Sequence, residues 1–138
     1  MKMINGAVEP GIRIGDFHIG GERTDIISKL GEPCEYRENG SRMKIYSYDN
    51  FTLWFDSNDR LNQIGVTKGF CGDYKSITVG STMGDVKRIF GQFESEDVMC
   101  TYMIAGVDGI CFELEDNDDW DELTAPIEWI FVYRCAPS

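Results

Sequence analysis

The densest group of side chains with chemical potential lies between Glu113 and Glu122, where seven of ten residues carry carboxylates. Because so many like charges repel one another, this segment is predicted to form a solvated loop. One aromatic residue interrupts the acids. The candidate binding residues of the loop are Glu115, Asp116, Asp118, Asp119, Trp120, Asp121 and Glu122.

Three roles are open for this acidic loop. It can serve solubility alone, as charged surface loops often do. It can bind calcium, because Asp116, Asp118 and Asp121 have a carboxylate spacing, although the central glycine and final glutamate of an EF-hand loop are missing. It can dock a basic partner, because Trp120 adds an aromatic anchor that solubility does not require. We favour docking and expect no metal.

The rest of the sequence gives little indication of a catalytic site. His18 is the only histidine, and it precedes a predicted helix in an ordinary structural setting. No phosphate-binding glycine loop and no H-E-x-x-H sequence is present. The five cysteines are irregularly spaced without a C-x-x-C pair, so we expect reduced thiols that act as small buried hydrophobes. We therefore predict no enzyme activity, no catalytic residue and no cofactor.

The net charge indicates which classes of molecule the chain can bind. The 138 residues include 13 Lys or Arg and 24 Asp or Glu, which gives a net charge of −11. Nucleic acids and anionic membranes would repel such a chain, whereas a basic protein would attract it. The first residues lack the apolar run of a secretory signal, and no stretch has the length of a membrane helix. A cytoplasmic protein is the expectation.

An internal repeat predicts the elements that hold these residues. Residues 17–31 align with residues 77–91 at an offset of 60 without a gap. Farther along the chain, residues 61–68 align with residues 127–134, so an insertion in the second copy falls near residues 115–125. The shared order of these matches indicates a duplication.

Each copy begins with a short predicted helix, and the two helices span residues 22–30 and 83–90. Apolar residues recur there at three- and four-residue spacing, which gives each helix one apolar face; in the second helix this face consists of Val86, Ile89 and Phe90. Gly31 and Gly91 are placed to end the helices, because glycine adopts the backbone conformation of a helix C-cap. Ser81 or Thr82 can cap the second helix, and Thr82 and Asp85 have the spacing of a capping box.

After each helix the apolar period changes to two, which indicates β-strands. The predicted strands cover residues 43–48, 51–56 and 61–66 in the first copy, and 99–104, 110–114 and 127–133 in the second. Asp49-Asn50 and Asp108-Gly109 are typical turn pairs between them. Each copy is thus predicted as one helix and a three-stranded antiparallel meander.

The expected fold class is therefore α+β, with two tandem helix-plus-meander units packed as one domain. This domain covers residues 1–138, with repeats at about 11–70 and 71–135. One unit alone would bury a single sheet face and be marginally stable, so the two units must pack together. We expect the helices on one sheet face and exposed aromatics such as Trp54 on the other, which is a second candidate binding surface.

Several short motifs follow one another in an order seen elsewhere. They are Gly20, Leu30-Gly31-Glu32-Pro33, Tyr46 and Tyr48, Trp54-Phe55-Asp56 and Asn58-Asp59-Arg60-Leu61. Their order resembles the small units of the BamE-like superfamily, and the doubled form resembles the β-lactamase inhibitory proteins. Similar units occur among bacterial toxin immunity proteins, including those of contact-dependent inhibition. The second copy departs from the pattern at Gly91-Gln92-Phe93.

This resemblance, together with the charge, implies an immunity protein. Such a protein would bind a cognate bacterial toxin domain, a basic nuclease in the first instance, and block its active site or substrate surface. An acidic protein can imitate the phosphate charges that a nuclease recognises. The alternative is a small-molecule or metal-binding domain with a pocket between the two repeats.

Overall fold

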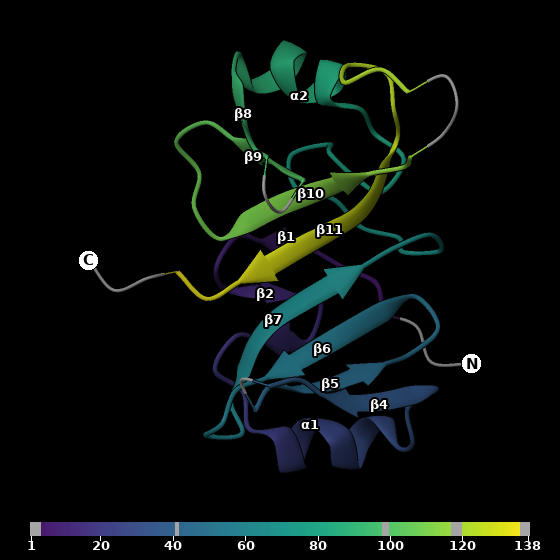
Figure 1. The fold of residues 1–138 in the computed structure, drawn as a ribbon, viewed down its shortest axis with the longest axis vertical. Coiled ribbons are helices and arrows are strands. Elements are labelled where there is room, and N and C mark those ends of the chain that lie inside the picture. Colours follow the sequence, from purple (N-terminus) through teal and green to yellow (C-terminus); the bar gives the residue numbers. More distant parts are fainter. Residues whose placement is uncertain (1–3, 41, 98–99, 117–119, 136–138) are drawn as a thin grey trace.

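An eight-stranded antiparallel sheet forms the centre of the protein (Figure 1). The computed structural model describes residues 4–40, 42–97, 100–116 and 120–135. The strands of this sheet are β4 (Glu35–Glu38), β5 (Lys44–Ser47), β6 (Phe51–Phe55), β7 (Leu61–Val66), β8 (Phe93–Glu96), β9 (Thr101–Ile104), β10 (Ile110–Leu114) and β11 (Ile127–Tyr133). Their order across the sheet is β4-β5-β6-β7-β11-β10-β9-β8.

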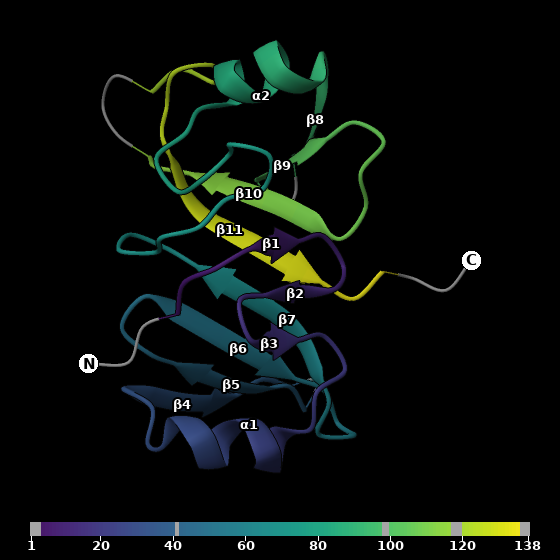
Figure 2. The same ribbon diagram turned by 180° about the vertical axis from the view of Figure 1, so that it is seen from behind.

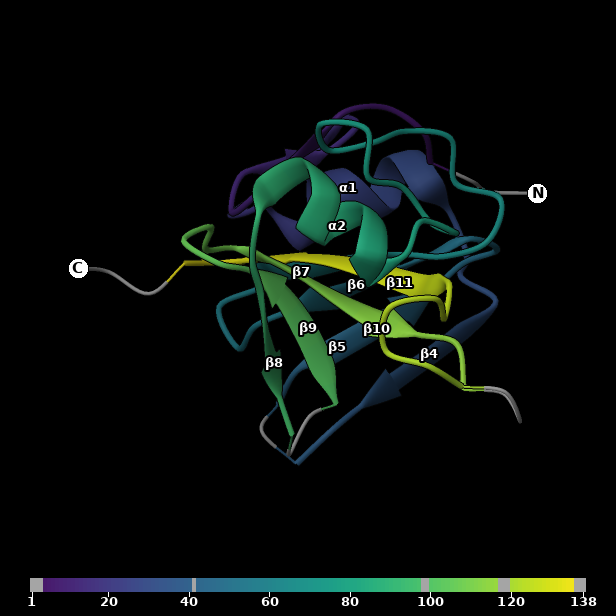
Figure 3. The ribbon, with the colours of Figure 1, turned by 90° about the horizontal axis from the view of Figure 1, so that it is seen from above.

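All other regular elements lie on one face of this sheet, which Figure 2 shows toward the viewer. Helix α1 (Arg23–Leu30) lies near β4 and helix α2 (Met83–Phe90) lies near β8. A small antiparallel sheet crosses the middle, and its strands are β1 (Val8–Glu9), β2 (Arg13–Ile14) and β3 (Phe17–His18). Figure 3 shows that the outer strands β8, β9 and β4 extend toward the opposite side.

The predicted turn at Asp49-Asn50 joins β5 to β6 and also anchors the N-terminal segment. The Tyr48 amide donates to the Phe51 carbonyl at 2.8 Å across this turn. Asn50 is buried, because the Ile4 amide donates to Asn50 Oδ1 at 3.1 Å and Asn50 Nδ2 donates to the Ile4 carbonyl at 3.3 Å. These two bonds satisfy a buried polar side chain and hold the start of the chain on the sheet.

Both helices begin and end within one residue of the predicted bounds. At the start of α2, Thr82 Oγ1 accepts from the Asp85 amide at 3.1 Å, and Asp85 Oδ2 accepts from the Thr82 amide at 3.0 Å. The predicted capping box is confirmed. Gly31 and Gly91 end the helices with φ of 80° and 94°, in the left-handed region that favours glycine. Among the described residues, neither helix is long and apolar enough to cross a membrane.

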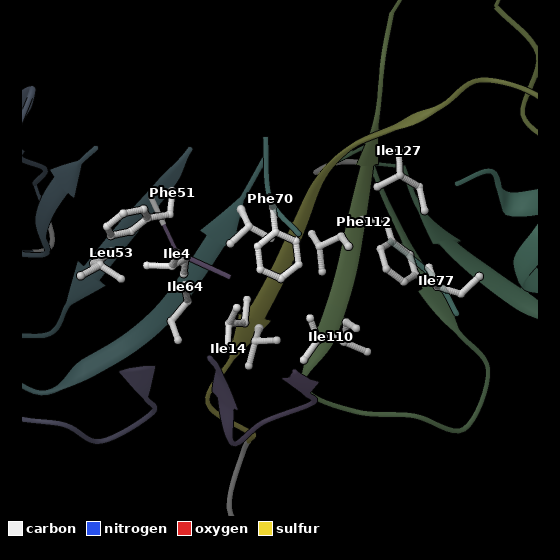
Figure 4. Packing of buried hydrophobic residues seen from close by; sticks show 14 of the residues in the cluster. Ile4, Ile14, Phe51, Leu53, Ile64, Phe70, Ile77, Ile110, Phe112 and Ile127 are labelled. Carbon is white, nitrogen blue, oxygen red and sulfur yellow. The ribbon is translucent and has the colours of Figure 1, made fainter. Parts of the chain in front are cut away.

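One hydrophobic core runs across the covered face of the sheet (Figure 4). Phe51 and Leu53 on β6 and Ile64 on β7 belong to the same cluster as Ile110 and Phe112 on β10, and all five are fully buried. The N-terminal segment and the connection from β7 to α2 add further buried residues, namely Ile4, Ile14, Phe70 and Ile77. The first and second halves of the chain therefore share a single core.

The predicted fold class is wrong. The protein is not an α+β pair of units with one helix and a three-stranded meander each, but a mainly β protein with one continuous large sheet. Each helix is followed by four strands, and β7 pairs with β11, so that Val66 lies opposite Ile130 and Ile64 opposite Val132. This pairing leaves neither β7 nor β11 with an unpaired edge, which two separately packed meanders would expose.

The pattern of apolar residues did not predict the two outermost strands, β4 and β8. All four residues of β4, Glu-Tyr-Arg-Glu, are exposed, and β8 has the polar sequence Phe-Glu-Ser-Glu. Charged side chains on an edge strand discourage pairing with other chains. The same charges remove the alternation by which a strand is predicted. The strands β1 to β3 have two residues each, which is too short to show a period.

Two smaller predictions are also wrong. The cysteines are not buried hydrophobes, because Cys111 is half-buried and the exposed ones are Cys34, Cys71, Cys100 and Cys135; all five are free thiols. Ile89, expected on the apolar face of α2, is 39% exposed. Val86, expected on the same face, is fully buried, and so is Met83.

Candidate functional site

In the described part of the chain, no helix lies over one face of the eight-stranded sheet, and we call this face the open face. It lies toward the viewer in Figure 1, with the N-terminal strands behind the sheet. Side chains alternate between the two faces along a strand, so residues that flank core residues point outward here. The outward residues of the central strands are Thr52, Trp54, Gln63, Gly65, Cys111, Glu113, Trp129, Phe131 and Tyr133.

Three aromatic rings cross the middle of the open face, and we call them the aromatic row. The ring centroids of Trp54 and Phe131 are 5.9 Å apart at an interplanar angle of 69°. Phe131 stacks on Trp129 with centroids 5.7 Å apart. Gly65 leaves room for this packing, because a Cβ atom there would lie 2.8 Å from Phe131 Cε1 and 3.2 Å from Trp54 Cζ3.

The aromatic row borders a surface depression of about 430 Å³. The depression spans both halves of the chain, since its walls come from β4, β5 and β6 on one side and from β10 and β11 on the other. Its lining residues are Arg37, Ser47, Tyr48, Asp49, Thr52, Trp54, Thr67, Glu113, Trp129 and Phe131. Partly exposed rings beside a hollow are a typical surface for binding another molecule.

A second depression, of about 370 Å³, adjoins the first toward β8, and we call it the acidic depression. Its lining residues are Ser95, Glu96, Asp97, Cys100, Thr101, Tyr102, Glu113, Leu114, Asp116 and Trp120. Four of them are carboxylates and none is Lys or Arg. Glu113 lines both depressions, so the aromatic and the acidic surfaces meet at this residue.

The acidic depression is electrostatically suited to a cation. Burial and the nearby Glu128 carboxylate raise the pKa of Glu113 above its ordinary value. None of the ion pairs among the described residues involves Glu113. Burial, then Glu113, raises the pKa of Cys111 to about 12, so this thiol stays protonated at neutral pH and is a poor nucleophile. A cationic group at Glu113 would relieve the repulsion between the carboxylates.

The structure brings part of the predicted acidic loop to this site. Asp116 and Trp120 line the acidic depression, and the Trp120 side chain is 45% exposed. The predicted residue Trp54 lies in the aromatic row of the adjoining depression. Two surfaces that the sequence offered as alternatives therefore join through Glu113.

The other loop residues have different positions. Glu115, Asp121 and Glu122 are exposed. Asp121 also shapes its own turn, because its Oδ1 accepts from the Leu123 amide at 2.8 Å. The predicted residues Asp118 and Asp119 lie outside the described residues, and so does part of the calcium hypothesis, which needs Asp118.

Nothing in the described part of the chain is arranged for metal binding by protein side chains. No group of three or more His, Cys, Asp or Glu side chains there is placed to hold an ion. His18 is exposed on β3, in the small sheet that lies on the covered face. Aromatic rings beside carboxylates on an open sheet suit noncovalent binding of a partner.

Sequence reasoning missed Glu113, Trp129 and Phe131 as site residues. Their strands are apolar at almost every position, since Ile130 and Val132 alternate with the aromatic residues of β11. A strand that is apolar on both faces predicts burial rather than an exposed surface. Aromatic residues at alternate positions of that strand were the signal that could have identified the site.

Comparisons with known proteins give the fold but no activity. No family model and no curated protein matches the sequence. The crystal structure of the uncharacterized protein YfeY from Escherichia coli is similar, with a TM-score of 0.64 and 12% identity over 95% of this chain and 100% of that one. An extracellular protein containing an SCP domain from Bacillus anthracis has a TM-score of 0.49 and 14% identity, over 84% of this chain and 44% of that one. At such identities only the fold is shared with YfeY.

Proposed function

We propose that this protein is an immunity-type inhibitor that binds a basic toxin domain through its open face. In this proposal the bound protein covers the active site or substrate surface of the toxin, and no chemical step occurs. The aromatic row is the observation that carries the proposal. Trp54 and Trp129 are partly exposed on a sheet face that no helix or strand of the described residues covers.

The energetics of protein interfaces support a binding role for these rings. Tryptophan side chains are enriched among the few residues that dominate binding energy, because they bury a large apolar area in a nearly rigid shape. A soluble protein gains nothing from leaving such rings in contact with water. Here Phe131 holds both tryptophans in place, so little conformational freedom remains to be lost on binding.

The charge supports a basic enzyme as the partner. A net charge of −11 accelerates encounter with a basic surface and opposes binding to nucleic acid. Toxin domains that act on nucleic acids carry basic substrate sites, so an acidic protein can occupy such a site in place of the substrate. The cytoplasmic location and the BamE-like resemblance belong to this proposal as hypotheses.

The test uses the product of the gene adjacent to the one that encodes this protein. The two proteins are co-expressed, and cell growth is scored together with the affinity of the purified pair. We expect the wild-type protein to protect growth and the Trp54→Ala/Trp129→Ala double variant to lose protection. Ile12→Ala, which removes a side chain 54% exposed on the turn between β1 and β2, is the matched control and should protect fully.

A second variant guards against loss of folding in the double variant. Gln63 lies between Trp54 and Tyr133 in the register of the sheet, so Gln63→Arg adds bulk and positive charge to the open face without removing a ring. It should also abolish protection. Full protection by folded Gln63→Arg and Trp54→Ala/Trp129→Ala proteins would overturn the proposal. Binding of metabolites instead of the neighbouring protein would favour the small-molecule alternative.

A further inference from the structure

The acidic charge is concentrated in one half of the chain. Residues 1–69 contain nine Lys or Arg and ten Asp or Glu, whereas residues 70–138 contain four and fourteen. Strands β8 to β11 contain no Lys or Arg at all. The large sheet therefore has one nearly neutral half and one strongly negative half.

This asymmetry extends to the open face. At the negative end, Glu94 pairs with Met103 and Glu96 with Thr101, and all four side chains point outward because the alternate residue Tyr102 packs on the core. Glu113 on β10 is the third outward carboxylate of this end, after Glu94 and Glu96.

The other end of the open face, at β4, carries no excess of negative charge. Arg37 on β4 forms an ion pair with Glu35, with 3.8 Å between Arg37 Nη1 and Glu35 Oε1. Toward the centre, the outward residues Ile45, Thr52 and Gln63 carry no charge. A ligand that crosses this face therefore meets an ion pair, then the aromatic row, and finally carboxylates on strands that contain no Lys or Arg.

We propose that the partner lies across the open face in one fixed direction, with its cationic side chains over β8 to β10 and its apolar side chains over the aromatic row. This inference rests on the proposed function and specifies the partner: a protein surface with adjacent cationic and apolar parts. Arginine or lysine near Glu94 and Glu113 offsets like-charge repulsion, whereas the same cation near Arg37 meets an ion pair with no net charge and gains little. The reverse orientation loses the attraction between the partner's cations and these carboxylates.

The two parts of the surface act on different steps of binding. Exposed carboxylates attract a basic surface from a distance and set the rate of association and its salt dependence. The aromatic row makes short-range contacts that set the rate of dissociation. Trp120 borders the acidic depression, where its ring can stack on a cationic side chain of the partner.

Peptide probes test this direction without knowledge of the natural partner. The full chain is labelled with ¹⁵N and titrated at low salt with hexalysine, with hexaglutamate, and with a hexapeptide of alternating lysine and leucine. We expect hexalysine to shift amide signals of β8 to β10 and hexaglutamate to shift none of these. The alternating peptide should in addition shift the indole N–H signals of Trp54 and Trp129.

Paired variants with equal changes in net charge provide the control. Glu94→Gln/Glu113→Gln removes two charges from the open face, and Glu22→Gln/Asp25→Asn removes two from the start of α1 on the covered side. The first pair should weaken hexalysine binding by roughly threefold or more at low salt, whereas the second should change it by less than about twofold.

Each outcome bears on the inference. Shifts at β4 and β5 from hexalysine, or equal weakening by both pairs of variants, would overturn the proposed direction. These results do not depend on the toxin hypothesis, because the peptides replace the partner. If the neighbouring gene product fails to bind while the peptides shift the expected amide signals, the proposed function is wrong. The inferred binding direction along the open face would still be supported.

Discussion

Gly65 determines how the aromatic row packs. Because a Cβ atom at this position would lie within 3 Å of the Phe131 ring, Gly65→Ala must displace Phe131 from its contacts with Trp54 and Trp129. We expect a loss of about 1–3 kcal/mol in the free energy of unfolding, as for other overpacked sites. The near-ultraviolet circular dichroism of the tryptophans should change as well. Denaturant titration measures the free energy of unfolding. A single near-ultraviolet spectrum measures the change in circular dichroism.

Gly40 provides the matched control for this substitution. A Cβ atom there would meet no heavy atom within 4 Å, and its φ lies outside the left-handed region. Gly40→Ala should change the free energy of unfolding by less than about 0.5 kcal/mol. Equal effects of the two substitutions would mean that Gly65 has no special packing role.

Asp59 accepts hydrogen bonds from two basic side chains, Arg23 and Lys44. Arg23 Nε donates to its Oδ1 at 3.0 Å, and Lys44 Nζ donates to the same oxygen. The hydrogen bond from Arg23, followed by that from Lys44, lowers the pKa of Asp59 to about 2 from an ordinary value of 3.8. Because the folded state has the lower pKa, this site stabilises the fold fully above pH 4 and loses that contribution as the pH falls toward 2.

The pH dependence of unfolding checks this assignment. Wild-type protein should lose more unfolding free energy between pH 4.5 and 2.5, values chosen to bracket the titration, than Asp59→Asn protein does. At neutral pH the variant should be the less stable of the two. Parallel pH profiles for both proteins would show that Asp59 gains nothing from Arg23 and Lys44 in the folded state.

The two helices differ in how they begin, although they have the same length. Thr82 and Asp85 form a complete capping box in α2, whereas the N-cap of α1, Glu22, makes no side-chain bond to the helix. Thr82→Ala should therefore lower the free energy of unfolding by about 1 kcal/mol. Glu22→Ala should lower it by less than about 0.5 kcal/mol. Thermal or chemical unfolding of both variants measures the difference, and an equal cost at both sites would refute the role of the box.

Local signals predicted most elements because each depends on a few neighbouring residues. The helix bounds followed from Gly31, Gly91 and the capping pair, and strands β7, β10 and β11 match the predicted segments 61–66, 110–114 and 127–133. Matched glycines also have equivalent bonds: the Gly20 amide donates to the Leu61 carbonyl at 2.8 Å, and the Gly80 amide to the Ile127 carbonyl at 2.9 Å.

Long-range pairing could not be predicted in the same way. No local pattern states that β7 pairs with β11, because this contact joins residues more than sixty positions apart. The polar sequences of β4 and β8 also hid the edges of the sheet. Likewise, Trp54 was identified because we expected exposed aromatic residues on the open sheet face, whereas Trp129 and Phe131 lie in a strand that is apolar at almost every position.

At the scale of the whole molecule, the shared core predicts that both halves unfold together. Phe112 is fully buried in the cluster that also contains Phe51 and Ile64. Phe112→Ala should cost about 3–5 kcal/mol and destabilise β6 as much as β10. Native-state hydrogen exchange of amides in both strands measures this. A variant that loses protection in β10 but keeps it in β6 would indicate two independent folding units.

We propose that the partner contacts the open face with its aromatic row and the acidic depression that adjoins it at Glu113. Hydroxyl-radical footprinting tests it directly, because the three tryptophans of the chain mark three positions: Trp54 and Trp129 in the row, and Trp120 beside the acidic depression. In the complex with the neighbouring gene product, oxidation of all three should fall, while oxidation of Ile12 on the covered side should stay unchanged. Protection at Ile12 with no change at Trp54 and Trp129 would show that the partner binds the covered side and not the open face.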